Sequence, residues 1–127
     1  MPEVLVNECA LVGCLTTKED ISVKEAAELL EKEKSKQLIV LKGDKPLLLI
    51  TLTDLVYKVM AAGKSPAKVK VSEIAAKDLF FVRDDEPLVK AYMYMNASNH
   101  WFCPVISGEK FAGLLTFSEA VKRLSKK

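Results

Sequence analysis

The chain has 127 residues, of which 50% are apolar and 28% are charged, and its 19 basic and 17 acidic side chains leave a net charge of +2. This balance is typical of a globular protein, and so small a charge gives no general attraction for nucleic acid or for anionic membranes. No apolar run approaches the roughly 20 residues needed to cross a bilayer. The N-terminal Met1-Pro2-Glu3 lacks the basic region of a signal peptide, so we expect a cytoplasmic protein.

The residues of the common catalytic and metal sites are largely missing. Cys9, Cys14 and Cys103 are odd in number and form no CxxC motif, so we interpret them as small buried thiols rather than as disulfide partners or zinc ligands. His100 has no nucleophile beside it, and the usual phosphate-loop, metalloprotease and serine-hydrolase motifs do not occur. We therefore expect neither catalysis nor a metal or other cofactor.

The first copy of an internal repeat begins near the N-terminus. Val4 to Met60 aligns without a gap on Val69 to Ser125, an offset of 65 residues, with twelve identical positions. A constant offset over this length indicates two copies of one supersecondary unit, and copies this short should share a core. We therefore divide the chain into repeat 1 (1–61), a linker (62–68) that contains Gly63 and Pro66, and repeat 2 (69–127).

Each copy has the same predicted elements. In the first, Ser22 and Glu25 form a capping box for a helix, and Gly43 marks a tight hairpin between two later strands. The elements predicted for the first copy are a turn capped by Asn7, strand 14–17, helix 23–30, strands 37–41 and 47–51, and helix 53–61 capped by Thr53. Those predicted for the second are a turn capped by Ser72, strand 79–82, helix 88–95, strands 102–106 and 111–116, and helix 118–124 capped by Ser118.

This β-α-β-β-α order, written twice, resembles a pair of cystathionine-β-synthase (CBS) domains, the Bateman module. The resemblance covers nearly the whole chain and is carried by the repeat, by Pro104-Val105, and by Gly113-Leu114-Leu115-Thr116-Phe117-Ser118-Glu119. The family string is Gly, two apolar residues, Thr or Ser, two variable residues and Asp. Copy one lacks the Gly but keeps Thr51 and Asp54, and copy two ends in Glu119. The implied fold is α/β, two repeats packed with pseudo-twofold symmetry.

The resemblance also implies a ligand site. Thr51 with Asp54, and Thr116 with Glu119, stand where a strand enters a helix, and there a hydroxyl, free N–H groups and a carboxylate suit the phosphate and ribose of an adenosyl compound. The same carboxylates would also cap the helix with no ligand bound. The extra methylene of Glu119 moves its carboxylate outward. The full candidate set is Thr16, Thr17, Lys18, Leu38, Ile39, Thr51, Asp54, Val82, Arg83, Phe102, Cys103, Pro104, Thr116 and Glu119.

Trp101 and the helix at 88–95 allow two interpretations each. Trp101 could stack on a purine or cover an edge of the core. The helix is apolar on almost every side, so it is either buried within one chain or packs in part against a partner. The family associates through helices, so we expect a homodimer whose interface includes Leu88, Tyr92 and Met95.

The function that the resemblance implies is regulatory or sensory binding of an adenosyl ligand, of the AMP, ADP, ATP or S-adenosylmethionine class, in the cleft between the repeats and without catalysis. We expect no nucleic-acid or membrane partner, and the sequence does not identify the effector protein that receives the signal. The alternatives are a ligand-free dimerisation or protein-interaction module with degenerate nucleotide sites, a small nucleotide hydrolase, and a nucleic-acid binder, for which the charge is unsuited.

Overall fold

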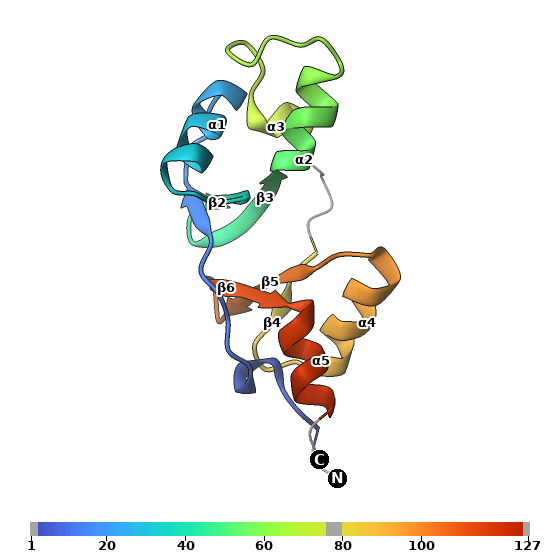
Figure 1. Ribbon diagram of the computed structural model, residues 1–127. Helices are drawn as coiled ribbons and strands as arrows, with labels where there is room; N and C mark the ends of the chain where they lie inside the picture. The colour runs from blue at the N-terminus through green and yellow to red at the C-terminus, as the bar shows by residue number, and fades with distance from the viewer. Residues whose placement is uncertain (1–2, 76–79, 126–127) are drawn as a thin grey trace. The chain divides into compact units, whose positions relative to one another are not determined.

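The computed structural model describes residues 3–75 and 80–125. The chain forms two compact units, and each is described by itself: the first-repeat unit, Cys14–Leu79, and the second-repeat unit, Met1–Gly13 with Phe80–Lys127 (Figure 1). The opening segment of the chain therefore belongs to the unit built by the second repeat. The compact units and the sequence repeats (1–61 and 69–127) divide the chain at different places.

The first-repeat unit is a three-stranded sheet with helices. Its elements are β1 (Leu15–Thr17), α1 (Val23–Lys32), β2 (Gln37–Lys42), β3 (Lys45–Thr51), α2 (Leu52–Leu55), which continues as the π-helical turn η2 (Val56–Met60), and α3 (Val71–Ile74). The strand order is β1-β2-β3, with β1 parallel and β3 antiparallel to β2. Ser22 and Glu25 form the predicted capping box, which starts α1 where the sequence places it.

The second-repeat unit repeats this arrangement. Its elements are η1 (Val6–Glu8, a 3-10 turn), β4 (Val82–Arg83), α4 (Leu88–Ser98), β5 (Phe102–Ser107), β6 (Lys110–Thr116) and α5 (Phe117–Ser125). The strand order is β4-β5-β6, again parallel and then antiparallel. The hairpin register shifts after Val40 in one unit and after Val105 in the other, which are the matching positions of the repeat.

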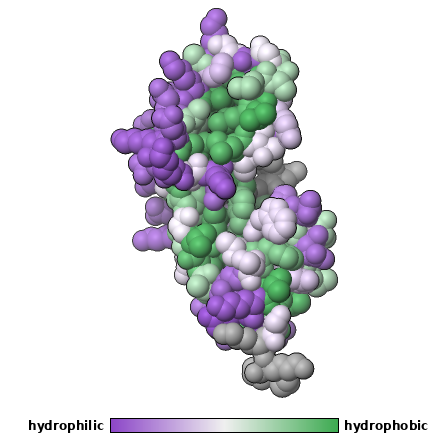
Figure 2. All heavy atoms as spheres, in the orientation of Figure 1, coloured by the Kyte–Doolittle hydropathy of each residue, from purple (hydrophilic) through white to green (hydrophobic). Residues whose placement is uncertain are grey.

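Each unit has its own apolar core, and each core includes residues from the opening segment of the other repeat. In the first-repeat unit Leu30, Leu38 and Ile50 pack with Val71 and Ile74, and in the second-repeat unit Val6 is fully buried with the helices and sheet. Burying one such side chain contributes about 1.5–3 kcal/mol, so these flanking segments are part of the core and not loose ends. Figure 2 shows hydrophobic atoms between α1 and α2 and a hydrophilic outer surface over α1.

Several predicted boundaries differ from the structure. The strand predicted at 79–82 is observed as β4, Val82–Arg83, which begins three residues later and shares Val82 with the prediction. Leu79 lies outside the described residues, as do the terminal Lys126 and Lys127. Neither Asn7 nor Ser72 caps a helical turn: the caps are Leu5 and Lys70, whose N–H groups donate to the carboxylates of Glu8 and Glu73. Ser72 instead donates to Asp20 across the first-repeat unit.

Candidate functional site

The junction from β3 into α2 holds the Thr51–Asp54 pair. Thr51 is the N-cap: its Oγ1 accepts from the Asp54 N–H at 3.2 Å. The Asp54 carboxylate reaches back, where Oδ2 accepts from the Thr51 N–H at 2.9 Å and from the Thr51 hydroxyl at 3.1 Å. The observed cap, Thr51, therefore lies two residues before the predicted cap, Thr53, because Thr51 and Asp54 have the spacing of a capping box and close it.

Asp54 has a second contact, on its other oxygen. Lys58, one turn along the helix, places Nζ 3.3 Å from Oδ1, and the same Nζ donates to the Ile74 carbonyl at 3.0 Å. The Asp54 side chain is 20% exposed and the Lys58 side chain 46% exposed. Each carboxylate oxygen can accept two hydrogen bonds, so Oδ1 keeps room for one more donor, such as a sugar hydroxyl.

The junction from β6 into α5 is the matching place in the second-repeat unit. Thr116 Oγ1 accepts from the Glu119 N–H at 3.2 Å, so Thr116 and not the predicted Ser118 caps α5. The Thr116 hydroxyl also lies 3.3 Å from that of Ser118. The Thr hydroxyl thus caps the helix as in the first-repeat unit, but the Glu119 carboxylate does not fold back on the cap.

Glu119 bonds to the N-terminal segment. Its Oε2 accepts from the Ala10 N–H at 2.9 Å and from Arg123 Nε at 3.1 Å, and its side chain is 15% exposed. The Ala10 N–H, followed by the Arg123 guanidinium, holds the pKa of Glu119 below its ordinary value. One extra methylene lets this carboxylate extend past Thr116 to another segment, whereas Asp54 folds back on its own cap.

The predicted strand wall lies farther along the sheet than the two junctions. In the register, Thr51 is opposite Gln37, while Thr16 is paired with Ile39 and so lies two residues away from that level. Thr17 Oγ1 accepts from the Glu19 N–H, and Lys18 pairs loosely with Asp44 at 3.7 Å, both side chains being more than half exposed. Thr16, Thr17 and Lys18 are therefore not gathered with Thr51 in this structure.

The same holds in the second-repeat unit. Val82 is fully buried in the core and pairs with Val105, three residues from Phe102, which is opposite Thr116. The Arg83 guanidinium donates to the Gly108 carbonyl at 3.0 Å, so it is occupied at the hairpin turn. Neither residue is brought to the Thr116 junction.

The candidate apolar wall is partly core. Leu38, Ile39 and Cys103 are fully buried, Pro104 is buried, and Phe102 is half-buried. Leu38 is opposite Ile50, one residue before Thr51, and Phe102 is opposite Thr116. Leu38 and Phe102 are therefore the members of this wall that the register brings beside the two junctions.

Trp101 lies on the surface next to the second junction. It is 72% exposed, contacts Phe117 edge to face with ring centroids 6.0 Å apart, and accepts the Phe117 N–H on its carbonyl at 2.8 Å. A pocket of about 140 Å³ lies here, lined by Met95, Asn96, Asn99, His100, Trp101 and Phe117. It is smaller than the about 300–1,000 Å³ of typical ligand pockets, so it could hold a ring but not a whole nucleotide.

The three cysteines are buried or half-buried. The three thiols are free, and burial raises the pKa of Cys14 to about 11 and that of Cys103 to about 12. Among residues 3–75 and 80–125 no cluster of His, Cys, Asp and Glu could hold a metal ion. In the same part of the chain no helix is both long and apolar enough to cross a membrane.

The predicted interface residues on α4 need correction. Leu88 and Met95 are fully buried in the core of the second-repeat unit, and Tyr92 stacks on Phe117 with ring centroids 5.5 Å apart. The prediction that Leu88 and Met95 contact a partner is wrong, because both lie on the face of α4 that packs into the core. The sequence did not reveal which face is buried, because α4 is apolar on almost every side. The exposed apolar residues of α4 are Val89 and Met93.

Three of the residues in contact with the junction carboxylates were not predicted from the sequence: Lys58, Arg123 and Ala10. The first two could have been found, since each is a cation four residues after the acid of its junction, at matching positions of the repeat. The third donates through its backbone, which every residue except proline can do, so no side-chain pattern could reveal it.

The two repeats correspond to two domains of a known family. The CBS domain model matches residues 10–61 and 71–126, so the chain belongs to the CBS domain family, and it carries two of these domains. A CBS domain pair is a regulatory module. No curated protein matches the sequence.

Solved structures share the fold across nearly the whole chain. An uncharacterized conserved protein from Pyrococcus horikoshii has a TM-score of 0.77 at 19% identity, covering 100% of this chain and 97% of its own. The CBS domain pair of protein MJ0100, in complex with 5-methylthioadenosine and S-adenosyl-L-methionine, has a TM-score of 0.73 at 26% identity, covering 97% and 96%. The hexameric CBS-CP12 protein from bloom-forming cyanobacteria has a TM-score of 0.76 at 26% identity, covering 95% and 68%.

Proposed function

We propose that this CBS pair binds an adenosyl compound, of the AMP, ADP, ATP or S-adenosylmethionine class, and that binding regulates a partner protein without catalysing a reaction. The observation that carries the proposal is the Thr51–Asp54 junction. It combines a helix N-terminus, a hydroxyl and a partly exposed carboxylate whose Oδ1 has room for a sugar hydroxyl. The complex of MJ0100 with two adenosyl compounds supports the ligand class.

The Asp54 carboxylate is the acceptor in this proposal. A vicinal pair of ribose hydroxyls can donate to a carboxylate, and hydrogen bonds to charged groups contribute about 1.5–3 kcal/mol. We therefore expect Asp54→Ala to weaken binding by about tenfold or more, as measured by titration calorimetry with AMP, ADP, ATP and S-adenosylmethionine.

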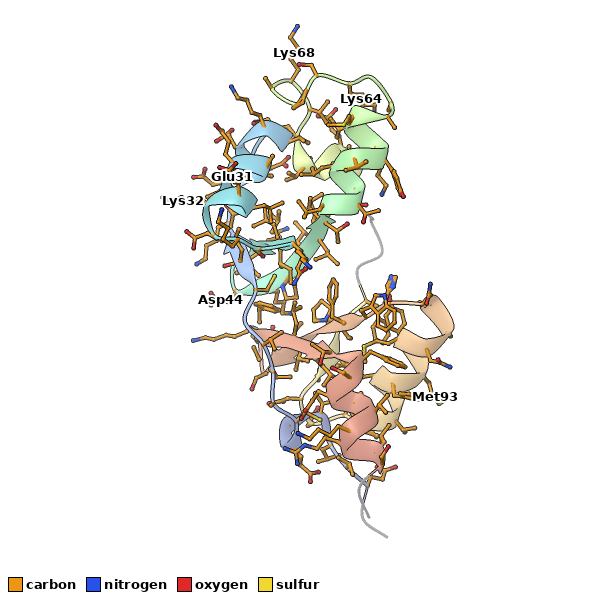
Figure 3. The ribbon with its side chains drawn as sticks, viewed as in Figure 1. Glu31, Lys32, Asp44, Lys64, Lys68 and Met93 are labelled. Carbon is orange, nitrogen blue, oxygen red and sulfur yellow. The ribbon has the colours of Figure 1, made fainter. Side chains whose placement is uncertain are left out.

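The experiment needs two matched variants. Asp54→Asn keeps an acceptor for the Thr51 N–H but removes the charge, so it separates loss of ligand contact from loss of the helix cap. Glu31→Gln makes the same charge change on the exposed surface of α1 (Figure 3) and should bind as the unaltered protein does. Equal affinity of the unaltered protein and Asp54→Ala would reject Asp54 as the acceptor.

A ligand-free interaction module is the second candidate. The observation that favours it is that both junction carboxylates already have partners within the chain: Asp54 bonds to Thr51 and Lys58, and Glu119 to Ala10 and Arg123. A ligand stabilises the folded state it binds by mass action, so a thermal-shift panel with the four compounds separates the candidates. No shift with any of them at millimolar concentration would favour the interaction module.

The remaining parts of the proposal concern assembly and location. We propose that copies of the chain associate through exposed apolar helix residues, which are Val89 and Met93 on α4 and Tyr57 and Met60 on η2. The hexameric CBS-CP12 protein, whose fold this chain shares, supports association between copies. A cytoplasmic location is in keeping with three free thiols, because disulfides form mainly in oxidising compartments.

A further inference from the structure

The two junctions are equivalent in sequence but not in contact. Asp54 closes a capping box on its own strand end, with the Thr51 N–H 2.9 Å from Oδ2. Glu119 instead accepts from Ala10, a residue 109 positions away along the chain, and its other described partner is Arg123 on its own helix. The contacts differ because the Glu side chain is one methylene longer than that of Asp, so its carboxylate extends to a more distant donor.

The segment that Glu119 holds is the opening part of the first repeat, which belongs to the second-repeat unit. It docks on the second-repeat unit through the Val12–Leu114 bridge, whose two N–H···O bonds are 2.9 and 2.8 Å, and through the Val6 and Asn7 N–H groups, which donate to Glu86 and Asp84 carbonyls. Val6 is fully buried and Cys9 packs against the same core. Between these contacts, Ala10 has its N–H on the Glu119 carboxylate.

The Ala10 and Arg123 contacts hold the Glu119 carboxylate away from the strand end at Thr116. Its Oε2 already accepts two donors, which is the usual capacity of one carboxylate oxygen, and both donors are within 3.1 Å. A ligand that needed Oε2, or that needed this carboxylate folded back toward Thr116 as Asp54 is folded toward Thr51, would have to displace Ala10 or Arg123.

We infer that Glu119 is a positioning residue that anchors the N-terminal segment on the second-repeat unit, and that the chain therefore binds one adenosyl ligand, at Thr51–Asp54. The stoichiometry rests on the proposed function, whereas the anchoring does not. In this arrangement the duplication has produced one ligand acceptor and one structural contact from the same position of the repeat.

The anchoring is measured without any ligand. Cys9 is adjacent to Ala10 and half-buried, and burial followed by the Glu119 charge raises the pKa of its thiol. The rate at which a thiol reagent labels Cys9, corrected in each variant for the thiolate fraction given by the pH dependence of that rate, therefore reports local opening of the segment. Peptide mass spectrometry of the labelled full chain separates Cys9 from Cys14 and Cys103. We expect Glu119→Ala to raise the Cys9 labelling rate by about tenfold, since a hydrogen bond to a charged acceptor is lost, and Glu119→Gln to raise it less, because an amide oxygen still accepts.

Asp54→Ala is the matched control in the other unit. It should leave Cys9 labelling unchanged, and it should weaken the ligand, whereas Glu119→Ala should leave the ligand affinity and the stoichiometry of one per chain unchanged. Unchanged Cys9 labelling in Glu119→Ala would overturn the anchoring.

Two ligands per unaltered chain, or weaker binding in Glu119→Ala and Glu119→Gln, would overturn the assignment of a single site. Absence of binding by the unaltered chain would reject the proposed function, and the labelling result would still decide the anchoring.

Discussion

Single side chains at the strand–helix junctions show how a small chemical difference redirects a contact. Asp54 and Glu119 occupy matching positions, follow a Thr at the same spacing, and precede a cation at the same spacing. Asp54 reaches the Thr51 N–H, and Glu119 reaches the Ala10 N–H. The conservative exchange of one acid for another can thus alter which segment of a protein is held in place.

The thiols give a prediction at the same scale. A group whose pKa is about 11 is about 1% thiolate at pH 9, and one whose pKa is about 12 is about 0.1% thiolate, because the fraction falls tenfold for each pH unit below the pKa. We expect Cys14 and Cys103 to react with iodoacetamide at least tenfold more slowly than denatured chain at pH 9. Burial causes both shifts, so unfolding in urea should restore the rate; equal rates in folded and unfolded protein would contradict the burial.

Among the elements, β6 contains a glycine, Gly113, at a position with no room for a side chain. Gly113 has φ +146°, and a Cβ there would lie 2.9 Å from the Val12 carbonyl oxygen, where the N-terminal segment pairs with β6. Gly108, in the β5–β6 turn, also has positive φ but has nothing near its Cβ position. Both glycines are needed for conformation, but Gly113 is needed for close packing as well.

This comparison predicts unequal effects of the same substitution. We expect Gly108→Ala to lower the free energy of unfolding by about 1 kcal/mol through backbone strain. Gly113→Ala adds a clash with backbone and should cost about 2 kcal/mol or more, and it should also speed Cys9 labelling. Urea unfolding of the two variants measures the difference, and equal midpoints would show that the N-terminal segment yields without cost.

How far the sequence predicts these elements depends on the kind of signal. The repeat, the hairpins and the start of α1 follow from periodicity, Gly at turns and the Ser22–Glu25 box, and the structure confirms them. The caps Thr51 and Thr116 were missed because Thr53 and Ser118 have equally good capping side chains, and only the packed strand end decides between them. The contact of Glu119 with Ala10 had no sequence signal, because its donor is a backbone group of a distant segment.

For the whole molecule, exposed apolar residues on helices set an expectation about assembly. Met93 is 62% exposed and projects from the outer side of α4, as its label in Figure 3 shows. Buried interfaces between copies are enriched in Met and depleted of Lys. We expect Met93→Lys to lower the apparent mass by light scattering after size exclusion, with Lys90→Met, on the same helix, unable to do so.

Two results with Met93→Lys and the unaltered chain would contradict this prediction. If the unaltered chain is a monomer at about 100 μM, or if Met93→Lys has the mass of the unaltered chain, α4 is not the contact between copies. Thermal unfolding provides the check on folding, because a substitution at an exposed position usually changes stability by only about 0.5 kcal/mol.

The exchange of segments between repeat and unit bears on how this chain can be divided. A cut between the two copies, after residue 61, would leave the buried Val6 on the first fragment, away from the core it fills, and would remove Val71 and Ile74 from the core of that same first fragment. The stretch from 14 to 79 keeps one assembled half intact, whereas no uninterrupted stretch does so for the other half, which needs both chain ends. Loss of one copy during evolution would therefore leave the other copy with an incomplete core, because each unit includes the opening residues of the other repeat.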